Sequence, residues 1–579
     1  MAAVRNRIDF SLSPDELFLD PHADPGFAFL QRPDFIWRPV EPGRIYGFSA
    51  SDHDSIRTKT ERFIRYTRLH KTFRKAIEFK TALVELQQAS FRKSYSLAAD
   101  KCLLNGAAGI RLLNRYCWEN ETAADDPEQR LIRYFSDKQT QYRVSDFPVL
   151  RKAPPRDIDF AIECRNTFNF YHFVTETLCH LCLLSDIDFQ GRVFIHFPNS
   201  EDKTRAFTSA FIEALFPELS GRVFLERTPK EYRRVLTAYS LFNSFYLLPH
   251  SVTSPLNDLA PSDEMWKGSL ATRSSQAVLS MNSLDSSLIR LRARAMAALE
   301  GHYCSHLPRR FFVGRKPGAA RQRTMEGEDQ LVELLSAMGF ATVAFEDYSP
   351  LDQIALMANA EIMVSPHGAG FTNMLFAHPD ALVIELGTLQ TAVHRWGDFW
   401  PLAVASGCRY VSFFADYNKS DPLTDPSFSD DGIVPVALGR RGLGEVLAFI
   451  AASIGKVPKL SRAEDVARLV QQLNRTGQIE QANAVLRQHQ HLQADSAKLA
   501  IAQAELHKAM GEGNAELKAL TDAWHADPTR WQTLVQIIWC ARKVSKSEVL
   551  VWAVQLLADE FPDRCLDLVK DRDWLKDLL

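Results

Sequence analysis

The stretch that decides the fold is Ile362-Met-Val-Ser-Pro-His-Gly-Ala-Gly-Phe-Thr-Asn-Met-Leu-Phe376. Its first three residues are apolar and predict the end of a buried parallel strand, and residues 371–376 predict the start of a short helix. Residues 382–386, Leu-Val-Ile-Glu-Leu, predict the next strand. A glycine-containing turn therefore joins a strand to a helix, as in an α/β sheet.

This turn is suited to hold a diphosphate. Gly368 and Gly370 lack a Cβ, so we expect positive φ angles and a close approach of the backbone to a ligand. The amides from Gly368 to Asn373 would point into the crevice beyond the strand ends, where helix N-termini favour phosphate. His367 and Asn373 flank the turn as groups for a ribose, phosphate or sugar hydroxyl, and Glu385 suits a ribose diol. The alternative is a glycine-rich turn with a structural histidine.

Two common phosphate-binding motifs are excluded. No Gly-Lys-Ser/Thr follows the turn, so it is not a Walker loop, and Asn373 occupies the place of the third glycine of a dinucleotide fingerprint. The turn closely resembles instead the signature of glycosyltransferase family 61. The matching residues are His367-Gly368-Ala369-Gly370, Asn373, Phe376 and Val-Ile-Glu385.

The resemblance covers residues 157–415. Further matching residues are Phe312-Val-Gly-Arg315, a second arginine at Arg321 or Arg323, Glu328 and Gln353. Gly314 stands where the family usually has serine, and the arginine after it is kept. The resemblance implies an inverting transferase with two Rossmann-like lobes (GT-B) that uses a nucleotide sugar. Family members add xylose, arabinose or N-acetylglucosamine to glycans or glycoproteins, and bacterial relatives are linked to capsule or surface polysaccharide.

A candidate base lies in the first lobe. Asn169-Phe-Tyr-His172-Phe-Val-Thr-Glu176 resembles the family's Asn-x-x-His…Glu segment. His172 and Glu176 are four positions apart and share a helical face, so the carboxylate can orient the imidazole as a general base. Glu176 as the base itself stays an alternative, and so does a structural network. A metal held by His172, Glu176 and His180 is disfavoured, because these positions span about two turns at ~1.5 Å per residue.

The leaving diphosphate needs positive charge. We expect Arg315 and Arg323 to supply it, although the sequence does not distinguish Arg321 from Arg323, and a structural salt bridge is the alternative for Arg315. No Asp-x-Asp follows a predicted strand to hold a divalent ion. The sequence therefore predicts a metal-independent enzyme with the nucleotide sugar as co-substrate and no other cofactor.

Composition narrows the class of protein. A hydrophobic content of 46% with 24% charged residues is typical of a globular protein, and a net charge of −3 gives no reason to expect nucleic acid as a partner. The first residues lack an apolar signal segment, and no apolar run approaches the length of a membrane span, so we expect a cytoplasmic protein with at most peripheral membrane contact. Cys179-His-Leu-Cys182 lies in an apolar run and predicts buried thiols.

Four regions follow along the chain. Residues 1–150 combine proline-interrupted segments with a basic helix over 55–98, which is either a solvated face or a surface for an anionic partner. Residues 151–300 predict an acceptor-side lobe, with a connecting loop at 251–284 and a lobe-bridging helix at 285–299. Residues 301–455 predict the nucleotide-sugar lobe. Residues 456–579 predict helices alone.

The helical region has a repeat. Gly477 and Gly511 define its spacing (511 − 477 = 34), and the prolines 528 and 562 show the same spacing (562 − 528 = 34). A period of 34 resembles tetratricopeptide repeats, although the usual Trp, Leu, Gly and Tyr positions of such repeats are poorly matched. Such a domain could bind a partner protein, or cap the second lobe.

The leading hypothesis is an inverting glycosyltransferase that moves a sugar from a UDP sugar to a glycan or surface-polysaccharide acceptor. One alternative is a dinucleotide-dependent oxidoreductase, which the missing third glycine weakens. Another is a non-catalytic nucleotide-sugar-binding scaffold that acts through its helical repeats.

Overall fold

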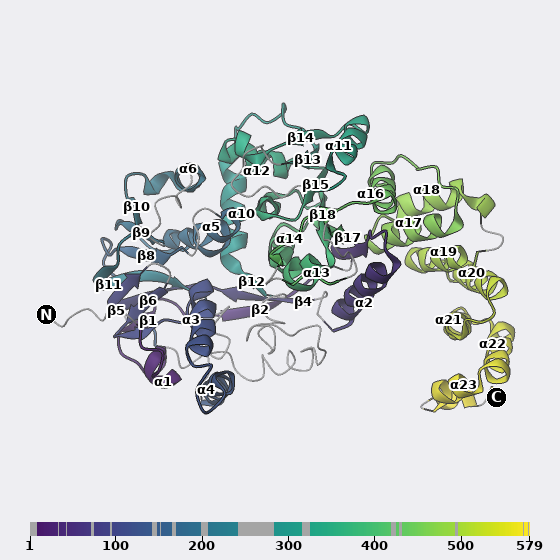
Figure 1. The fold of residues 1–579 in the computed structure, drawn as a ribbon, viewed down its shortest axis with the longest axis horizontal. Coiled ribbons are helices and arrows are strands. Elements are labelled where there is room, and N and C mark those ends of the chain that lie inside the picture. Colours follow the sequence, from purple (N-terminus) through teal and green to yellow (C-terminus); the bar gives the residue numbers. More distant parts are fainter. Residues whose placement is uncertain are drawn as a thin grey trace. The chain divides into compact units, whose positions relative to one another are not determined.

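The chain divides into two compact units (Figure 1). The computed structural model describes residues 8–32, 34–41, 43–70, 75–92, 95–141, 148–150, 152–164, 169–197, 206–240, 283–314, 325–417, 424–427, 431–492, 496–570, 572–576 and 578–579. The first unit comprises Met1–Gly47, Thr58–Met325 and Gly339–Val436, and the second Phe48–Arg57, Glu326–Met338 and Ala437–Leu579. The helical unit therefore begins before the expected residue 456, because α16 (Arg440–Ser453) packs with the helices that follow it.

The first unit contains an eight-stranded mixed sheet. Three parallel strands, β8, β9 and β10, alternate with helices along the chain and form a β-α-β-α-β unit (Figure 1). β11 pairs parallel with β8 and antiparallel with β5, so the sheet continues into strands from the N-terminal region. The strands are β1 (Phe27–Phe29), β5 (Ala82–Arg92), β6 (Tyr95–Ala98), β7 (Lys101–Cys102), β8 (Phe160–Glu163), β9 (Val193–His196), β10 (Val223–Glu226) and β11 (Lys230–Tyr239).

The predicted helix over 55–98 is wrong in its second half. α2 (Asp54–His70) is followed by β4 (Lys75–Lys80) and β5. β5 contains helix-forming residues, but pairing with β1 and β11 buries most of the strand, and this long-range context outweighs local propensity. β4 lies between β12 (Ser283–Asp285) and β2 (Asp34–Pro39) in a small separate sheet.

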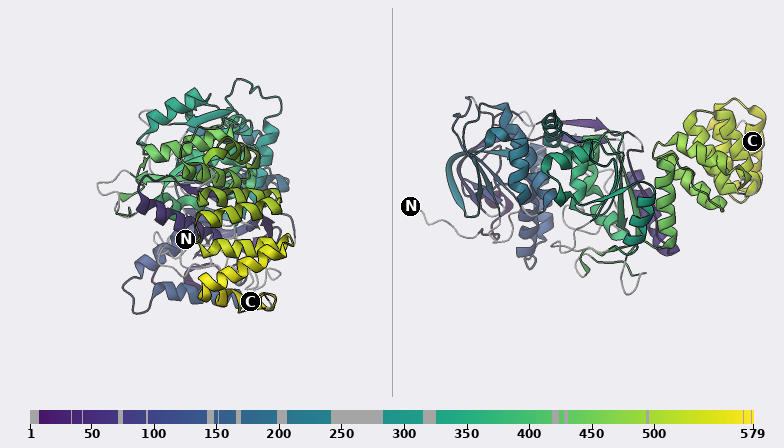
Figure 2. Two further views of the ribbon diagram at one scale, coloured as in Figure 1. Left: turned by 90° about the vertical axis from the view of Figure 1, so that its right-hand side faces the viewer. Right: turned by 90° about the horizontal axis from the view of Figure 1, so that it is seen from above.

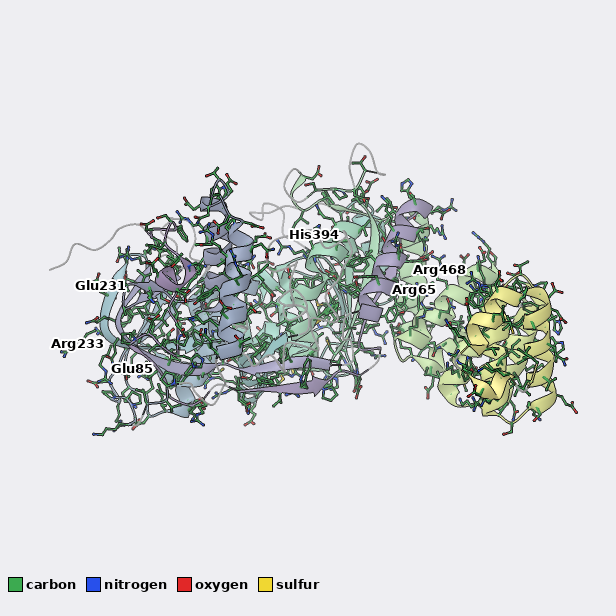
Figure 3. The ribbon with its side chains drawn as sticks, turned by 90° about the horizontal axis from the view of Figure 1, so that it is seen from below. Arg65, Glu85, Glu231, Arg233, His394 and Arg468 are labelled. Atoms are coloured by element: carbon green, nitrogen blue, oxygen red, sulfur yellow. The ribbon has the colours of Figure 1, made fainter. Side chains whose placement is uncertain are left out.

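The burial of charged side chains on β5, β11 and α2 shows which side of each element faces solvent. Glu85 on β5 is buried and accepts hydrogen bonds of 2.8 and 2.7 Å from Arg234, whereas Glu231 and Arg233 on β11 are exposed (Figure 3). On α2, Arg65 is exposed while Phe63 is buried, which fits a solvated basic face over an apolar stripe (Figure 3).

The second sheet carries the stretch that decided the fold. Its strands run in the order β14-β13-β15-β16-β17-β18, with β3 beside β17, and all pairs from β14 to β17 are parallel. β13 is the first of these parallel strands in the sequence; β14, the second, lies on one side of it, and β15, the third, lies on the other. The strand order therefore reverses between β13 and β15, and open α/β sheets bind ligands at such a reversal. The strands are β3 (Ile45–Ser49), β13 (Arg310–Val313), β14 (Ala341–Val343), β15 (Ile362–Pro366), β16 (Leu382–Thr388), β17 (Arg409–Tyr417) and β18 (Val436–Ala437).

One hydrophobic core joins the elements of the first sheet to those of the second. α10 (Ser286–Ala298) links them, as the sequence predicted for residues 285–299. Its Arg290 pairs with Asp186, and its Arg292 donates a 2.8 Å hydrogen bond to the carbonyl of Leu375. The predicted connecting loop at 251–284 lies, up to residue 282, outside the described residues.

The second unit is built from helix pairs that stack one behind another (yellow-green to yellow in Figure 2). The first helices of three pairs begin at Ala463, Ala497 and Trp531, so their starts repeat with one constant spacing (497 − 463 = 34, 531 − 497 = 34). The helices are α17 (Ala463–Arg475), α18 (Ile479–Gln488), α19 (Ala497–Met510), α20 (Gly513–Ala526), α21 (Trp531–Lys543) and α22 (Ser547–Glu560). Gly477 and Gly511 join the helices of a pair, as the sequence predicted. In the described part of the chain, no helix is long and apolar enough to cross a membrane.

Candidate functional site

His367 follows β15, and the buried carboxylate of Glu385 fixes the position of its ring. Its Nδ1 lies 2.5 Å from Oε1 of Glu385, whose side chain is 0% exposed. The other oxygen, Oε2, accepts hydrogen bonds from Tyr410 (2.5 Å) and Ser412 (2.7 Å). Because carboxylate oxygens accept, Nδ1 donates and Nε2 carries the lone pair. Burial, and then the nearby Glu385, raise the pKa of Tyr410 well above its usual value.

This geometry differs from the contact with a ribose diol expected for Glu385. Both of its oxygens accept hydrogen bonds within the protein, and the side chain is 0% exposed, so it does not lie at a surface where a ribose could bind. Glu385 therefore orients His367. No pattern in the sequence pointed to the hydrogen bonds that Tyr410 and Ser412 donate to Glu385, because these two residues come from the next strand, β17.

The turn after His367 is a 3₁₀ helix, η8 (Ala369–Phe376). The positive φ angles expected at its glycines are absent: the φ of Gly368 is 174°, and Gly370 is not in the left-handed region. Gly368, Ala369 and Gly370 are partly exposed, so their backbone is accessible. Asn373 is 1% exposed and donates a 3.4 Å hydrogen bond to Gln353, so its side chain faces the interior and not the surface expected for a ligand contact.

A second histidine pairs with a carboxylate on α5 (Phe170–Glu176). Asn169 caps this helix, and its side chain accepts a hydrogen bond from the amide of Tyr171. Nδ1 of His172 lies 2.6 Å from Oε1 of Glu176, and the two side chains are 17% and 19% exposed. His172 and Glu176 thus share a helical face as predicted, and Nε2 of the imidazole is left to accept a proton.

His180 does not extend this pair into a metal site. After Glu176 the chain continues as a 3₁₀ helix, η2 (Leu178–Asp186), whose tighter winding changes the direction of later side chains. Nε2 of His180 binds Oδ2 of Asp285 at 2.8 Å.

Residues at both histidine–carboxylate pairs contact the 3₁₀ turn η9 (Trp396–Phe399), which contains Asp398. The hydroxyl of Tyr171 donates a 3.0 Å hydrogen bond to the carbonyl of Asp398. The Phe399 ring lies 5.7 Å from the Tyr171 ring and 5.4 Å from the His367 ring. Burial raises the pKa of Asp398, and Arg395, His367 and His172 act on it in the opposite direction.

His172 and His367 lie far apart in the sequence, and both are next to η9: His172 through its neighbour Tyr171, and His367 through its ring contact with Phe399. The Asp398 side chain is 38% exposed, so it is surrounded by protein and still reaches solvent. Sequence reasoning missed it. The one available signal was a lone acidic residue in an aromatic run, Trp396-Gly-Asp398-Phe-Trp400.

Residues 170–384, which include both histidines, match the family model described as Glycosyltransferase 61. This segment is a glycosyltransferase 61 domain. The protein is accordingly a glycosyltransferase. The chain has no match among curated proteins.

The arginines expected to bind the donor of this glycosyltransferase, Arg315 and Arg323, lie outside the described residues, as does Arg321. Their segment begins after Gly314, whose amide donates a 3.0 Å hydrogen bond to Val343 on the strand beside β13. Because β13 and β15 are parallel neighbours, the chain leaves β13 at the same edge of the sheet as His367.

Among described residues of the glycosyltransferase, Arg395 on α13 (Leu389–Arg395) adds a cation near this edge. Its Nη1 lies 3.4 Å from Oδ2 of Asp398. The preceding His394 is exposed (Figure 3).

Within the described ranges, one group has metal-ligand character: atoms of Cys179, His180 and Asp285 lie within 4.8 Å of one another. Each already has a protein partner. Asp285 also accepts a hydrogen bond from Ser287 at the start of α10, and Sγ of Cys179 donates to the carbonyl of Thr175. The predicted buried thiols are confirmed: Cys179 and Cys182 are 0% and 3% exposed, and burial raises the pKa of Cys182 to about 12.

Proposed function

We propose that this glycosyltransferase moves a sugar from a nucleotide sugar, with UDP as the nucleotide, to a hydroxyl of a glycan or surface-polysaccharide acceptor with inversion. The observation that carries the proposal is that two oriented histidines meet at one turn, η9: His172 through its neighbour Tyr171, and His367 through Phe399. They come from elements of two different sheets, as a site that joins a donor to an acceptor requires.

On the donor side, the accessible backbone of residues 368–370 binds the diphosphate, and Nε2 of His367 accepts a hydrogen bond from a hydroxyl of the ribose or the sugar. Arg315 and Arg323, which follow β13 in the sequence, neutralise the diphosphate. A hydrogen bond from a guanidinium to a charged oxygen contributes roughly 1.5–3 kcal/mol and strengthens as the oxygen gains charge in the transition state. The order of strands supports this location, because the edge lies where the strand order reverses between β13 and β15.

On the acceptor side, His172 is the general base. The 2.6 Å contact with Glu176 keeps the proton on Nδ1, so Nε2 takes the proton of the acceptor hydroxyl. The hydroxyl oxygen forms its bond to the anomeric carbon from the face opposite the diphosphate. The bond between that carbon and the phosphate oxygen breaks, and its electron pair leaves with the nucleotide. The arrangement supports Glu176 as the group that orients the base.

We propose a metal-independent reaction, in which arginines and amides take the place of a divalent ion. Transfer should survive EDTA. Loss of transfer in EDTA and its recovery with Mn²⁺ would refute this part of the proposal.

We also propose the arrangement of the lobes, the role of the helical domain and the localisation of the enzyme. The two sheets are the cores of two Rossmann-like lobes in a GT-B arrangement, and the helix pairs are a tetratricopeptide-like domain that binds a protein partner. The constant spacing of the helix pairs supports the latter. We place the enzyme in the cytoplasm, which fractionation of the producing cell tests.

A thermal-shift panel tests the donor. UDP and UDP sugars at 100 times their dissociation constant should stabilise the native state by about 2.7 kcal/mol, whereas NAD should not. Release of UDP from UDP-xylose, UDP-arabinose and UDP-N-acetylglucosamine, in the presence of glycan acceptors, then measures turnover. An enzyme that is stabilised by no uridine nucleotide and releases no UDP would overturn the proposed function.

A further inference from the structure

We propose that Tyr171 is a positioning residue of the transfer reaction, which holds α5, the helix of the general base, in a fixed place relative to the donor-binding turn. The inference rests on the proposed function, because it takes His172 as the base and the backbone of residues 368–370 as part of the donor site. It gives a role in the reaction to Tyr171 and to its ring partner Phe399.

Tyr171 contacts η9 with both its hydroxyl and its ring. The hydroxyl donates a 3.0 Å hydrogen bond to the Asp398 carbonyl, and the centre of the ring lies 5.7 Å from that of the Phe399 ring, which it meets edge to face. The same ring lies 5.3 Å from the imidazole of His172, the next residue. A hydrogen bond depends on direction and a ring contact on separation, so together they define the place of α5 relative to η9.

Phe399 extends these contacts to the donor side. Its side chain is 4% exposed, and its ring lies 5.4 Å from the imidazole of His367 and 5.3 Å from the ring of Phe371 in η8. α5 also packs directly against η8. The base helix and the donor-binding turn are therefore joined by one set of packed side chains. Because protein interiors are close-packed, a displacement of one member is transmitted to the others.

The preceding residue, Phe170, holds α5 to its own lobe. Its ring lies 5.0 Å from that of Phe211 on α6 (Ala206–Leu215), the helix between β9 and β10. This contact places α5 on the acceptor side. The contacts of Tyr171 place the same helix relative to the donor side.

Transfer depends on the relation between these two sides. The acceptor oxygen must approach the anomeric carbon to roughly 3–3.5 Å while its proton stays within reach of Nε2 of His172. α5 carries the imidazole, and the turn after β15 holds the donor. A misplacement of about 1 Å can lower the rate about 10²-fold, so a small shift of α5 is enough to slow the reaction without weakening donor binding.

Tyr171→Phe tests the inference, because it removes the hydrogen bond and keeps the ring. The kcat for UDP release in the presence of a glycan acceptor should fall about 10-fold, since the base is less well aligned. The thermal shift with UDP should stay as in the wild type, because the donor-binding backbone is unchanged.

A double-mutant cycle distinguishes positioning of the base from a merely structural role. In His172→Gln the base is absent, so its alignment no longer affects the rate. Adding Tyr171→Phe to His172→Gln should therefore change kcat by less than about 2-fold. A contact that only stabilises the fold would lower kcat by the same factor in both backgrounds.

Tyr417→Phe is the matched control, because the Tyr417 hydroxyl also donates a 3.0 Å hydrogen bond to a backbone carbonyl, that of Thr424. Its kcat per folded molecule should match that of the wild type. Phe399→Leu covers the case in which Tyr171→Phe does not fold. It removes the ring that Tyr171 contacts, so kcat at saturating donor should fall in the wild-type background and stay unchanged in the His172→Gln background.

The outcomes separate the inference from the proposed function. A wild-type enzyme that turns over while Tyr171→Phe lowers kcat no more than Tyr417→Phe does overturns the inference alone. An equal fall in kcat with and without His172 also overturns it. A wild type that releases no UDP from any donor of the panel refutes the proposed function instead.

Discussion

Tyr410 and Glu385 lie on neighbouring strands, and the tyrosine hydroxyl donates a 2.5 Å hydrogen bond to a carboxylate that is 0% exposed. With Ser412 and His367, it gives this buried anion three donors. A buried charge is tolerated only while its donors are present. The position of the His367 ring therefore depends on a residue that a ligand never reaches.

We predict that Tyr410→Phe destabilises the first unit by about 1.5–3 kcal/mol, because it removes a hydrogen bond to a charged group. Denaturant unfolding followed by tryptophan fluorescence measures the loss. The matched control is Tyr417→Phe on the same strand, whose hydroxyl donates to the neutral carbonyl of Thr424 at 3.0 Å. That substitution should cost only about 0.5–1.5 kcal/mol. Equal losses would contradict the role of the buried charge.

We predict that His172→Gln lowers kcat about 10²- to 10⁴-fold, because it removes the proton acceptor, and leaves the thermal shift with UDP unchanged. Glu176→Gln should have a smaller effect, since the imidazole remains. His180→Gln is the control: this imidazole binds Asp285, so its loss should lower the melting temperature without changing kcat per folded molecule. A rate of His172→Gln equal to that of the wild type would exclude His172 as the base.

Local sequence predicted those parts of the fold whose pattern is local. The apolar run of β15, the glycines after it and the apolar run of β16 follow one another closely in the sequence, and the helix pairs repeat a short unit. β5 was mistaken for helix because its partners, β1 and β11, are far away in the sequence. Its burial, and hence its conformation, depends on contacts that a window of sequence does not contain.

The candidate site also has one part that local sequence predicts and another that depends on long-range contacts. The pairing of His172 with Glu176 follows from a spacing of four on a helix, and so was predictable. The pairing of His367 with Glu385 needs the register of two parallel strands, and the contacts of Tyr171 and His367 with η9 need the packing of one core. The sequence predicted that Glu385 and Asn373 contact the ligand, but both side chains are buried. Their burial depends on which side of the sheet is covered, and local sequence does not show this.

Burial of His196 predicts a pH-dependent stability. This imidazole is 1% exposed and lies 2.9 Å from the Tyr232 hydroxyl, and burial lowers its pKa to about 4. Between pH 6.5 and 4 the unfolded chain takes up a proton that the native protein does not bind. Stability is therefore fully present above about pH 6.5 and is lost as the pH falls toward 4, by about 3 kcal/mol in total.

The measurement is denaturant unfolding at pH 7 and pH 5 for the wild type and His196→Gln, which keeps a polar partner for Tyr232 but does not titrate. The drop between the two pH values should be smaller in the variant. His378→Gln serves as the control, because the side chain of His378 is 54% exposed. If His196→Gln and the wild type lose the same stability on acidification, His196 is not the group responsible.

The third helix pair contains a residue that the repeat disfavours. Gly477, Gly511 and Ser545 occupy equivalent positions of the repeat (511 − 477 = 34, 545 − 511 = 34), and all have a positive φ, of 76°, 77° and 57°. The hydrogen bonds repeat too: the amide of each residue donates to the carbonyl three positions before it. Glycine tolerates this left-handed backbone, whereas serine is strained in it.

We predict that Ser545→Gly stabilises the helical unit by about 0.5–1 kcal/mol, the relief of strain exceeding the entropy that glycine loses on folding. The reverse change, Gly511→Ser, should destabilise it by about 1 kcal/mol. A Cβ at Gly511 meets no atom within 4 Å, so backbone strain and not a clash sets this cost. Thermal unfolding of the full chain measures both shifts. If the two substitutions shifted the melting temperature in the same direction, the equivalence of the two positions would be refuted.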